Sequence, residues 1–163
     1  MNIAVIGTGY VGLVTGVCYA ELGHRVVCVD NDADKIASLK SGAIPIYEPD
    51  LAELSRRNMA KGRLSYTTDL TSAVALSTLV VVAVGTPAAP GGEADLTAID
   101  QVADEIADAM NGYKIVAVKS TVPVGTNERV RDRIRRRTRE RFDSVSLPEF
   151  LREGTAVRDT MHP

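Results

Sequence analysis

Three glycines near the N-terminus have the spacing of a phosphate-binding turn. Gly7, Gly9 and Gly12 form the pattern G-x-G-x-x-G between a short apolar run and a segment with helical periodicity. In such a turn the first glycine permits a tight bend, the second lets a diphosphate approach the backbone, and the third lets the helix lie close to the strand. The helix N-terminus adds free N–H groups and a partial positive charge. The pattern therefore predicts a site for the diphosphate of a dinucleotide.

An acidic residue at the end of the second apolar run indicates which dinucleotide binds. Asp30 lies about 20 residues beyond the glycines, where a carboxylate accepts hydrogen bonds from the adenosine ribose. A carboxylate there would repel a 2′-phosphate, and it is followed by Asn31 and Asp32 rather than by the arginine that favours NADP. We therefore predict NAD as the cofactor. A glycine turn in another kind of α/β protein, or a flavin site, is the alternative.

Apolar runs alternate with helical patterns along the whole chain, and these elements must position the turn. Strands are predicted at 1–6, 25–30, 64–67, 78–85, 113–120 and 142–147, and helices at 10–22, 31–40, 50–61, 96–110 and 126–141, with a short helix after Asp69. Asp50 and Asp69 are predicted helix caps. The run 78–85 is the most apolar, which predicts a central strand buried on both faces. The fold class is therefore α/β, a Rossmann-like, doubly wound parallel sheet in three α/β/α layers.

The loops after the last three predicted strands carry hydroxyl and carboxylate side chains. They are the segments 84–87, 119–126 and 146–154. Ligands of doubly wound sheets lie across the carboxyl ends of the strands, so these loops form one polar rim. Each loop on its own is explained equally well by turn residues and helix caps.

Four motifs taken together are more specific. In chain order they are "GTGYVGLVTG", "VGTP…ADLTAI", "KSTVPVGT" and "PEFLREGTAV". They resemble the UDP-glucose/GDP-mannose 6-dehydrogenase family over essentially the whole chain, and the proline of "TVPVGT" is more similar to its UDP-glucose branch. The resemblance implies an NAD-dependent, two-step oxidation of a nucleotide sugar's primary alcohol to a carboxylate. The alternatives within the family are oxidation of GDP-mannose or of UDP-N-acetylmannosamine.

The resemblance also implies roles for individual residues. The positions that match the family's NAD contacts are Gly7, Gly9, Tyr10, Val11, Gly12, Asp30, Lys35, Thr86, Thr121 and Glu153. Those that match its substrate-binding segment are Glu149, Phe150, Leu151, Arg152 and Glu153. Thr121, Glu149 and Glu153 are the catalytic candidates, the first two as residues that position a water or handle protons in the second oxidation. Lys35 is otherwise a solvated lysine, and Leu147 departs from the asparagine that the family usually has there.

The resemblance further implies a chain more than twice this long, with its nucleophilic cysteine in the later part. Residues 1–163 are therefore predicted to be an NAD-binding domain that lacks the substrate-binding domain, binds NAD weakly and turns nothing over. Cys18 and Cys28 fall in a helix and a strand, where a small buried hydrophobe is expected. The segment 149–163 is predicted to be poorly ordered because its packing partners are missing. The full-length enzyme is expected to be a homodimer, and a stand-alone dinucleotide-binding module is the rival interpretation.

The composition of the chain argues against nucleic acid, membranes and metal ions as partners. The net charge of −2 gives no general attraction to nucleic acid or to a membrane surface, and no apolar run approaches the length of a membrane helix. No signal peptide or zinc-site spacing is present, so we predict a cytoplasmic protein without a metal. The arginine-rich segment 126–141 is interpreted as a solvated outer helix, with Val130 and Ile134 facing the sheet, rather than as a nucleic-acid site.

Overall fold

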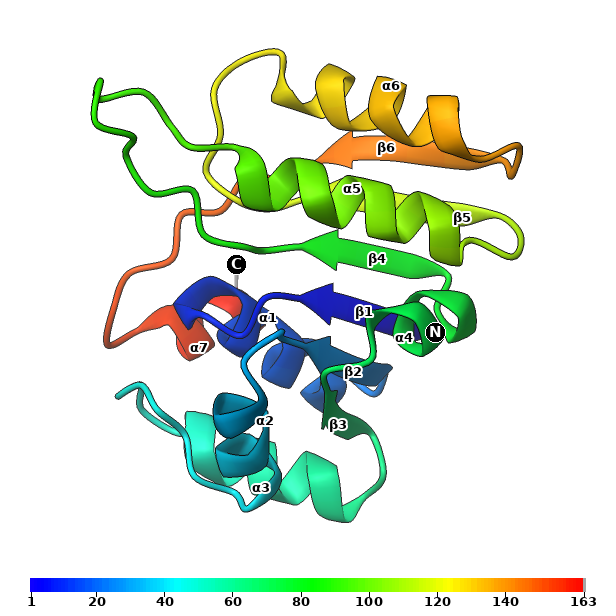
Figure 1. The fold of residues 1–163 in the computed structure, drawn as a ribbon. Coiled ribbons are helices and arrows are strands. Elements are labelled where there is room, and N and C mark those ends of the chain that lie inside the picture. Colours follow the sequence, from blue (N-terminus) through cyan, green and yellow to red (C-terminus); the bar gives the residue numbers. More distant parts are fainter. Residues whose placement is uncertain (163) are drawn as a thin grey trace.

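Parallel strands form a single twisted sheet in the computed structural model, which describes residues 1–162 (Figure 1). The strand order is β3-β2-β1-β4-β5-β6. The strands are β1 (Asn2–Ile6), β2 (Arg25–Val29), β3 (Leu64–Thr67), β4 (Leu79–Val82), β5 (Lys114–Val118) and β6 (Phe142–Ser146). Because the order reverses between β1 and β4, the chain leaves their carboxyl ends in opposite directions, which opens a crevice at that point. The predicted doubly wound parallel sheet is confirmed.

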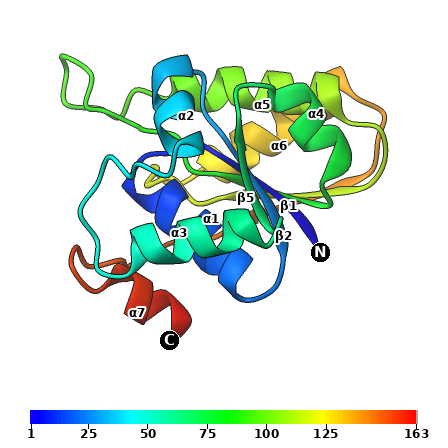
Figure 2. The same ribbon diagram turned by 90° about the horizontal axis from the view of Figure 1, so that it is seen from below.

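Helices cover both faces of the sheet (Figure 2). They are α1 (Tyr10–Glu21), α2 (Ala33–Lys40), α3 (Leu51–Ala60), α4 (Leu70–Leu76), α5 (Thr97–Ala109), α6 (Thr126–Arg137) and α7 (Ala156–Met161). Helix α1 packs against α3 and α7 on one face, whereas α5 packs against α4 and α6 on the other. The expected three-layer α/β/α architecture is therefore confirmed. Among residues 1–162, no helix is both long and apolar enough to cross a lipid bilayer.

The side chains of β4 alternate between two hydrophobic cores. Val80 and Val82 pack in the core that also contains Ile106 of α5, whereas Val81 packs with Leu13 of α1 in the core on the other face. All three valines are almost completely buried. The prediction of a central strand buried on both faces is confirmed, because helices on each side exclude water from a parallel sheet.

Two helix ends differ from the sequence-based expectation. Helix α6 ends at Arg137 rather than at 141, since Thr138 adopts an extended backbone and its hydroxyl oxygen accepts the Glu140 N–H. Asp50 does precede α3, but its side chain makes no capping hydrogen bond because its backbone is left-handed, with φ of 64°. Asp69 caps α4 as predicted, and Asp32 caps α2; each carboxylate accepts the backbone N–H of the third residue that follows it.

The C-terminal segment contradicts the expectation that it lacks packing partners. Residues 156–161 form α7, which packs on α1 and buries Ala156 and Val157 in the core of that face. The partner was missed because it lies within the same chain, about 140 residues earlier in sequence. Pro163, the last residue of the segment, lies outside the described residues.

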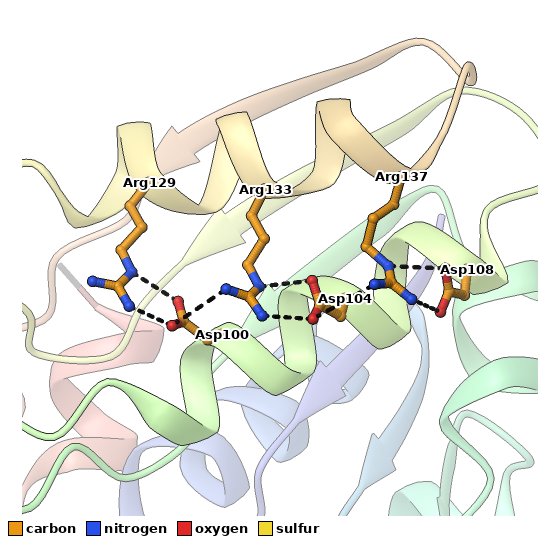
Figure 3. Close-up of polar contacts among 6 residues, drawn as sticks. All are labelled: Asp100, Asp104, Asp108, Arg129, Arg133 and Arg137. Carbon is orange, nitrogen blue, oxygen red and sulfur yellow. Dashed lines mark hydrogen bonds and ion pairs between the residues drawn. The ribbon is translucent and has the colours of Figure 1, made fainter.

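Three of the arginines in α6 form a ladder of ion pairs with α5 (Figure 3). The ladder consists of Arg129, Arg133 and Arg137 with Asp100, Asp104 and Asp108. Both helices place these residues four apart, so each guanidinium donates two hydrogen bonds to one carboxylate. Val130 and Ile134 face the sheet as expected. Part of the arginine run is therefore engaged within the domain rather than simply solvated.

We expect Asp104→Asn to lower the melting temperature by about 2 °C at neutral pH, because it breaks the paired contacts with Arg133 at 2.6 and 2.7 Å. The hydrogen bond from Arg133 holds the pKa of Asp104 below its ordinary value of 3.8. The stabilisation is therefore fully present above that value and is lost as the pH falls through the lowered pKa.

Thermal melts across pH and salt test this. The difference between the variant and the original chain should shrink in about 1 M NaCl and disappear in acid. Glu93→Gln, in an exposed loop, serves as the control. A melting-temperature difference that persists unchanged in acid would contradict the assignment.

Candidate dinucleotide-binding site

Only glycine fits at the first position of the turn, because the backbone there lies close to the residue that follows β4. Gly7 has φ of 99°, and its N–H donates to the Val29 carbonyl at 2.8 Å. A Cβ at this position would lie 2.4 Å from the carbonyl oxygen of Ala83. A residue with a side chain would therefore be strained and would also clash with the backbone that follows β4. The turn after β1 therefore lies at the crevice between the carboxyl ends of β1 and β4.

The other two glycines of the motif have different surroundings. A Cβ on Gly12 would lie 2.0 Å from the Gly7 carbonyl oxygen, so this glycine allows the first turn of α1 to fold against the bend. A Cβ on Gly9 would meet nothing within 4 Å. Gly9 is the N-cap of α1, and the N–H groups of the first turn have no helical acceptor. The space in front of Gly9 therefore suits a diphosphate, as the motif predicts.

Asp30 is held in place by several hydrogen-bond donors. The backbone N–H and the hydroxyl of Thr8 donate to its Oδ2 at 2.9 and 2.6 Å, and Lys35 Nζ lies 3.1 Å from the same oxygen. The N–H of Asp32 donates to Oδ1 at 3.1 Å, which leaves capacity on that oxygen for a ribose hydroxyl. Burial raises the pKa of Asp30, but the hydrogen bonds outweigh burial and hold it below its ordinary value. The group is therefore an anion at neutral pH.

One pocket of about 360 Å³ joins these groups. Of the predicted cofactor residues, its lining contains Gly7, Gly9, Asp30 and Lys35. It also contains residues that sequence reasoning did not assign to a site, namely Thr68, Leu70, Ala98, Gln101, Val102 and Glu105. These come from the segment leading into α4 and from α5, whose pattern indicates only an amphipathic helix. Their apolar members and the adjacent strand ends offer a surface suited to a planar base.

Two further predicted residues meet at the polar rim. The Thr86 hydroxyl, after β4, donates to the Thr121 carbonyl oxygen, after β5, at 2.7 Å. The loop after β6 starts beside them, because the Leu147 N–H donates to the Val118 carbonyl at 2.8 Å. The structure therefore gathers the three strand-end loops at one edge, as expected. The Leu147 side chain packs against the hydrophobic core, so an apolar residue fits there.

The predicted substrate residues do not point to a common place. The Glu149 carboxylate accepts the Leu151 N–H at 2.6 Å, and the Leu151 side chain packs against the core. Arg152 pairs with Asp159 of α7, whereas the Phe150 side chain is 89% exposed. Glu153 is exposed as well. Their binding and catalytic roles, together with that of Thr121, stay predictions.

Tyr10 and Val11, which were grouped with the cofactor contacts, belong to the first turn of α1. The Tyr10 hydroxyl donates to Glu48 Oε2 at 2.6 Å, and Tyr10 does not line the pocket, so its side chain is engaged elsewhere. Its contact with the cofactor stays a prediction. Glu48 was missed because it lies in a proline-punctuated loop with no motif around it. Within residues 1–162, His, Cys, Asp and Glu side chains form no group of three or more suited to a metal ion.

Comparisons with known proteins agree with this geometry. The family model described as UDP-glucose/GDP-mannose dehydrogenase family, NAD binding domain, matches residues 1–163. UDP-glucose 6-dehydrogenase TuaD of Bacillus subtilis is 54% identical over 163 residues, which cover 99% of this chain and 35% of that protein. UDP-glucose 6-dehydrogenase of Rhizobium meliloti is 54% identical over 166 residues, covering 100% of this chain and 38% of that protein. The chain thus spans less than two fifths of these relatives.

Solved structures show the same similarity. A UDP-glucose dehydrogenase from the hyperthermophilic archaeon Pyrobaculum islandicum superposes with a TM-score of 0.94 at 41% identity, over 99% of this chain and 38% of that one. A GDP-mannose dehydrogenase from Pseudomonas aeruginosa gives a TM-score of 0.93 at 39% identity, over 98% and 38% of the two chains. The backbone alone therefore does not separate the two substrates.

We expect Gly9→Ala to change NAD affinity and Gly12→Ala to change stability. The methyl group of Gly9→Ala enters open space, so the melting temperature should hold while NAD affinity falls about tenfold or more. Gly12→Ala forces the Gly7 carbonyl away and should lower the melting temperature by several degrees. Calorimetric titration and thermal melts measure both effects. Unchanged NAD affinity in Gly9→Ala would place the diphosphate elsewhere.

We also expect Thr8→Val to weaken NAD binding about fivefold, because Asp30 loses one of the donors that orient it. The preference for NAD over NADP should fall with it, and Thr8→Ser should restore both. Thr15→Val is the matched control, since its buried hydroxyl bonds to the Val11 carbonyl, within α1. Equal affinities for the original chain and Thr8→Val would show that Asp30 does not need this contact.

Proposed function

Since the chain belongs to the UDP-glucose/GDP-mannose dehydrogenase family as its NAD binding domain, we propose that it serves an enzyme that oxidises UDP-glucose to UDP-glucuronate. The observation that supports this most is one pocket that joins the glycine turn to Asp30, in a chain whose relatives of 54% identity are named UDP-glucose 6-dehydrogenases. The primary alcohol would be oxidised in two steps, each consuming one NAD.

The residues present fit NAD. The first-turn amides of α1, next to the open space at Gly9, would hold the diphosphate. The Asp30 carboxylate would accept a ribose hydroxyl and repel a 2′-phosphate. Lys35 partly balances the negative charge of Asp30 at 3.1 Å. When bound, the nicotinamide supplies the acceptor for the hydride that leaves the sugar carbon.

Residues on the loops after β5 and β6 would position a water molecule and transfer its proton. A hydroxyl and a carboxylate on neighbouring loops are suited to hold a water and take its proton during hydrolysis of a covalent intermediate. We assign these roles to Thr121 and Glu149, with Glu153 beside the cofactor and the sugar. Support comes from their positions on the loops that follow β5 and β6, adjacent strands of the sheet.

The chain by itself is proposed to be inactive because neither of its two cysteines is a competent nucleophile. Cys18 and Cys28 are both completely buried. Burial raises the pKa of Cys18 to about 11 and that of Cys28 to about 12, so both remain thiols at neutral pH. We propose that this domain belongs to a longer protein, which supplies the nucleophile and the sugar-nucleotide pocket. We also propose that this longer protein is a cytoplasmic homodimer. GDP-mannose is the second candidate substrate, since the backbone superposes equally well on a GDP-mannose dehydrogenase.

Calorimetry with NAD tests the cofactor half of the proposal. The chain is expected to bind NAD weakly and to form no NADH when UDP-glucose is added. An absence of heat and of any thermal shift with NAD would overturn the cofactor assignment.

Steady NADH formation by this chain alone would refute the proposed inactivity. In a longer protein that carries this domain, kcat/KM for UDP-glucose should exceed the values for GDP-mannose and UDP-N-acetylmannosamine. No turnover of any nucleotide sugar by that protein would favour a dinucleotide-binding module without chemistry.

A further inference from the structure

Glu48 is a buried carboxylate that neither the motifs nor the pocket account for. It lies in the loop between α2 and α3 and is 6% exposed. Its Oε2 accepts the Tyr10 hydroxyl at 2.6 Å and the Gly154 N–H at 2.8 Å, and its Oε1 accepts the Val157 N–H at 3.3 Å. A buried charge is tolerated only where donors surround it, so these contacts must form together.

The partners of Glu48 come from two functionally different segments. Tyr10 is the first residue of α1, at the turn proposed to bind the diphosphate. Gly154 and Val157 flank the start of α7, directly after the segment 149–153 that carries the proposed substrate residues. The Tyr10 hydroxyl also lies 3.5 Å from the Arg152 carbonyl oxygen. Direct contacts therefore connect the cofactor turn with the proposed substrate segment.

Glu48 is charged and the Tyr10 hydroxyl is neutral at neutral pH, as their shifted pKa values indicate. Burial raises the pKa of Glu48, but the hydrogen bonds from Tyr10, Gly154 and Val157 outweigh it and leave the pKa below its ordinary value. Burial, and then the hydrogen bond with Glu48, raises the pKa of Tyr10. The Tyr10 hydroxyl thus keeps its proton, and the contact holds across the neutral pH range.

We propose that Glu48 is a positioning residue that couples occupation of the diphosphate site to the placement of the segment 149–154. A diphosphate that binds the first-turn amides fixes the start of α1, and with it the Tyr10 ring. The hydroxyl then holds Glu48, which holds the amides at the start of α7. The coupling itself concerns NAD and this segment, whereas its benefit to the sugar substrate rests on the proposed function.

Hydrogen exchange at the Gly154 and Val157 amides, measured with and without saturating NAD, tests the coupling. In the original chain NAD should slow exchange at both amides by about fivefold or more. Tyr10→Phe removes only the hydroxyl and leaves the hydrogen bonds that the Gly154 and Val157 amides donate to Glu48. At NAD concentrations that saturate this variant, whatever its affinity, the NAD-dependent slowing should be lost.

Two further variants separate coupling from stability. Tyr66→Phe removes another buried hydroxyl, one that bonds to Ser55 at 2.8 Å, and should keep the slowing despite any loss of stability. Glu48→Gln should speed exchange at both amides even without NAD, because an amide side chain replaces the carboxylate that both donors need.

The outcomes are distinct. NAD binding without slower exchange at these amides in the original chain, or slowing that survives in Tyr10→Phe, would overturn the coupling and leave the proposed function intact. An absence of NAD binding altogether would overturn both.

Discussion

The close contact between the glycine turn and the end of β4 is the constraint on which the site depends. The Ala83 carbonyl occupies the place where a side chain on Gly7 would lie, and the Gly7 carbonyl occupies the place of one on Gly12. Because the backbone packs this tightly, α1 starts directly at the crevice between β1 and β4. The first-turn N–H groups of α1 have no helical acceptor, and the space in front of Gly9, its N-cap, is open.

The variable positions of the glycine motif connect the turn to the rest of the domain. Thr8 donates two hydrogen bonds to Asp30, which follows β2, and so holds the carboxylate in place. Tyr10 reaches the opposite way, to Glu48 and through it to the start of α7. The glycines therefore create the space for a ligand, whereas the residues between them fix what surrounds that space.

The arginines of α6 form ion pairs with a neighbouring helix of the same domain. Positive charge on α6 would suggest a polyanion partner if the helix were considered alone. Carboxylates at the same four-residue spacing on α5 take up Arg129, Arg133 and Arg137, and burial of Val130 and Ile134 fixes the helix on the sheet. The ladder joins α6 to α5, and α5 lines the pocket through residues other than those of the ladder.

Local pattern determined the strands, most helices, the glycine turn and Asp30, because hydrophobic period and glycine spacing act over a few residues. Tertiary structure alone decided that Thr8 orients Asp30, that α5 lines the pocket, and that Glu48 joins Tyr10 to α7. Those contacts connect residues from about 20 to more than 100 positions apart, and a hydroxyl or carboxylate carries no local sign of its distant partner. The order of residues 156–161 has the same origin, because α7 packs on α1. The early end of α6 is local instead, since the Thr138 hydroxyl accepts the Glu140 N–H.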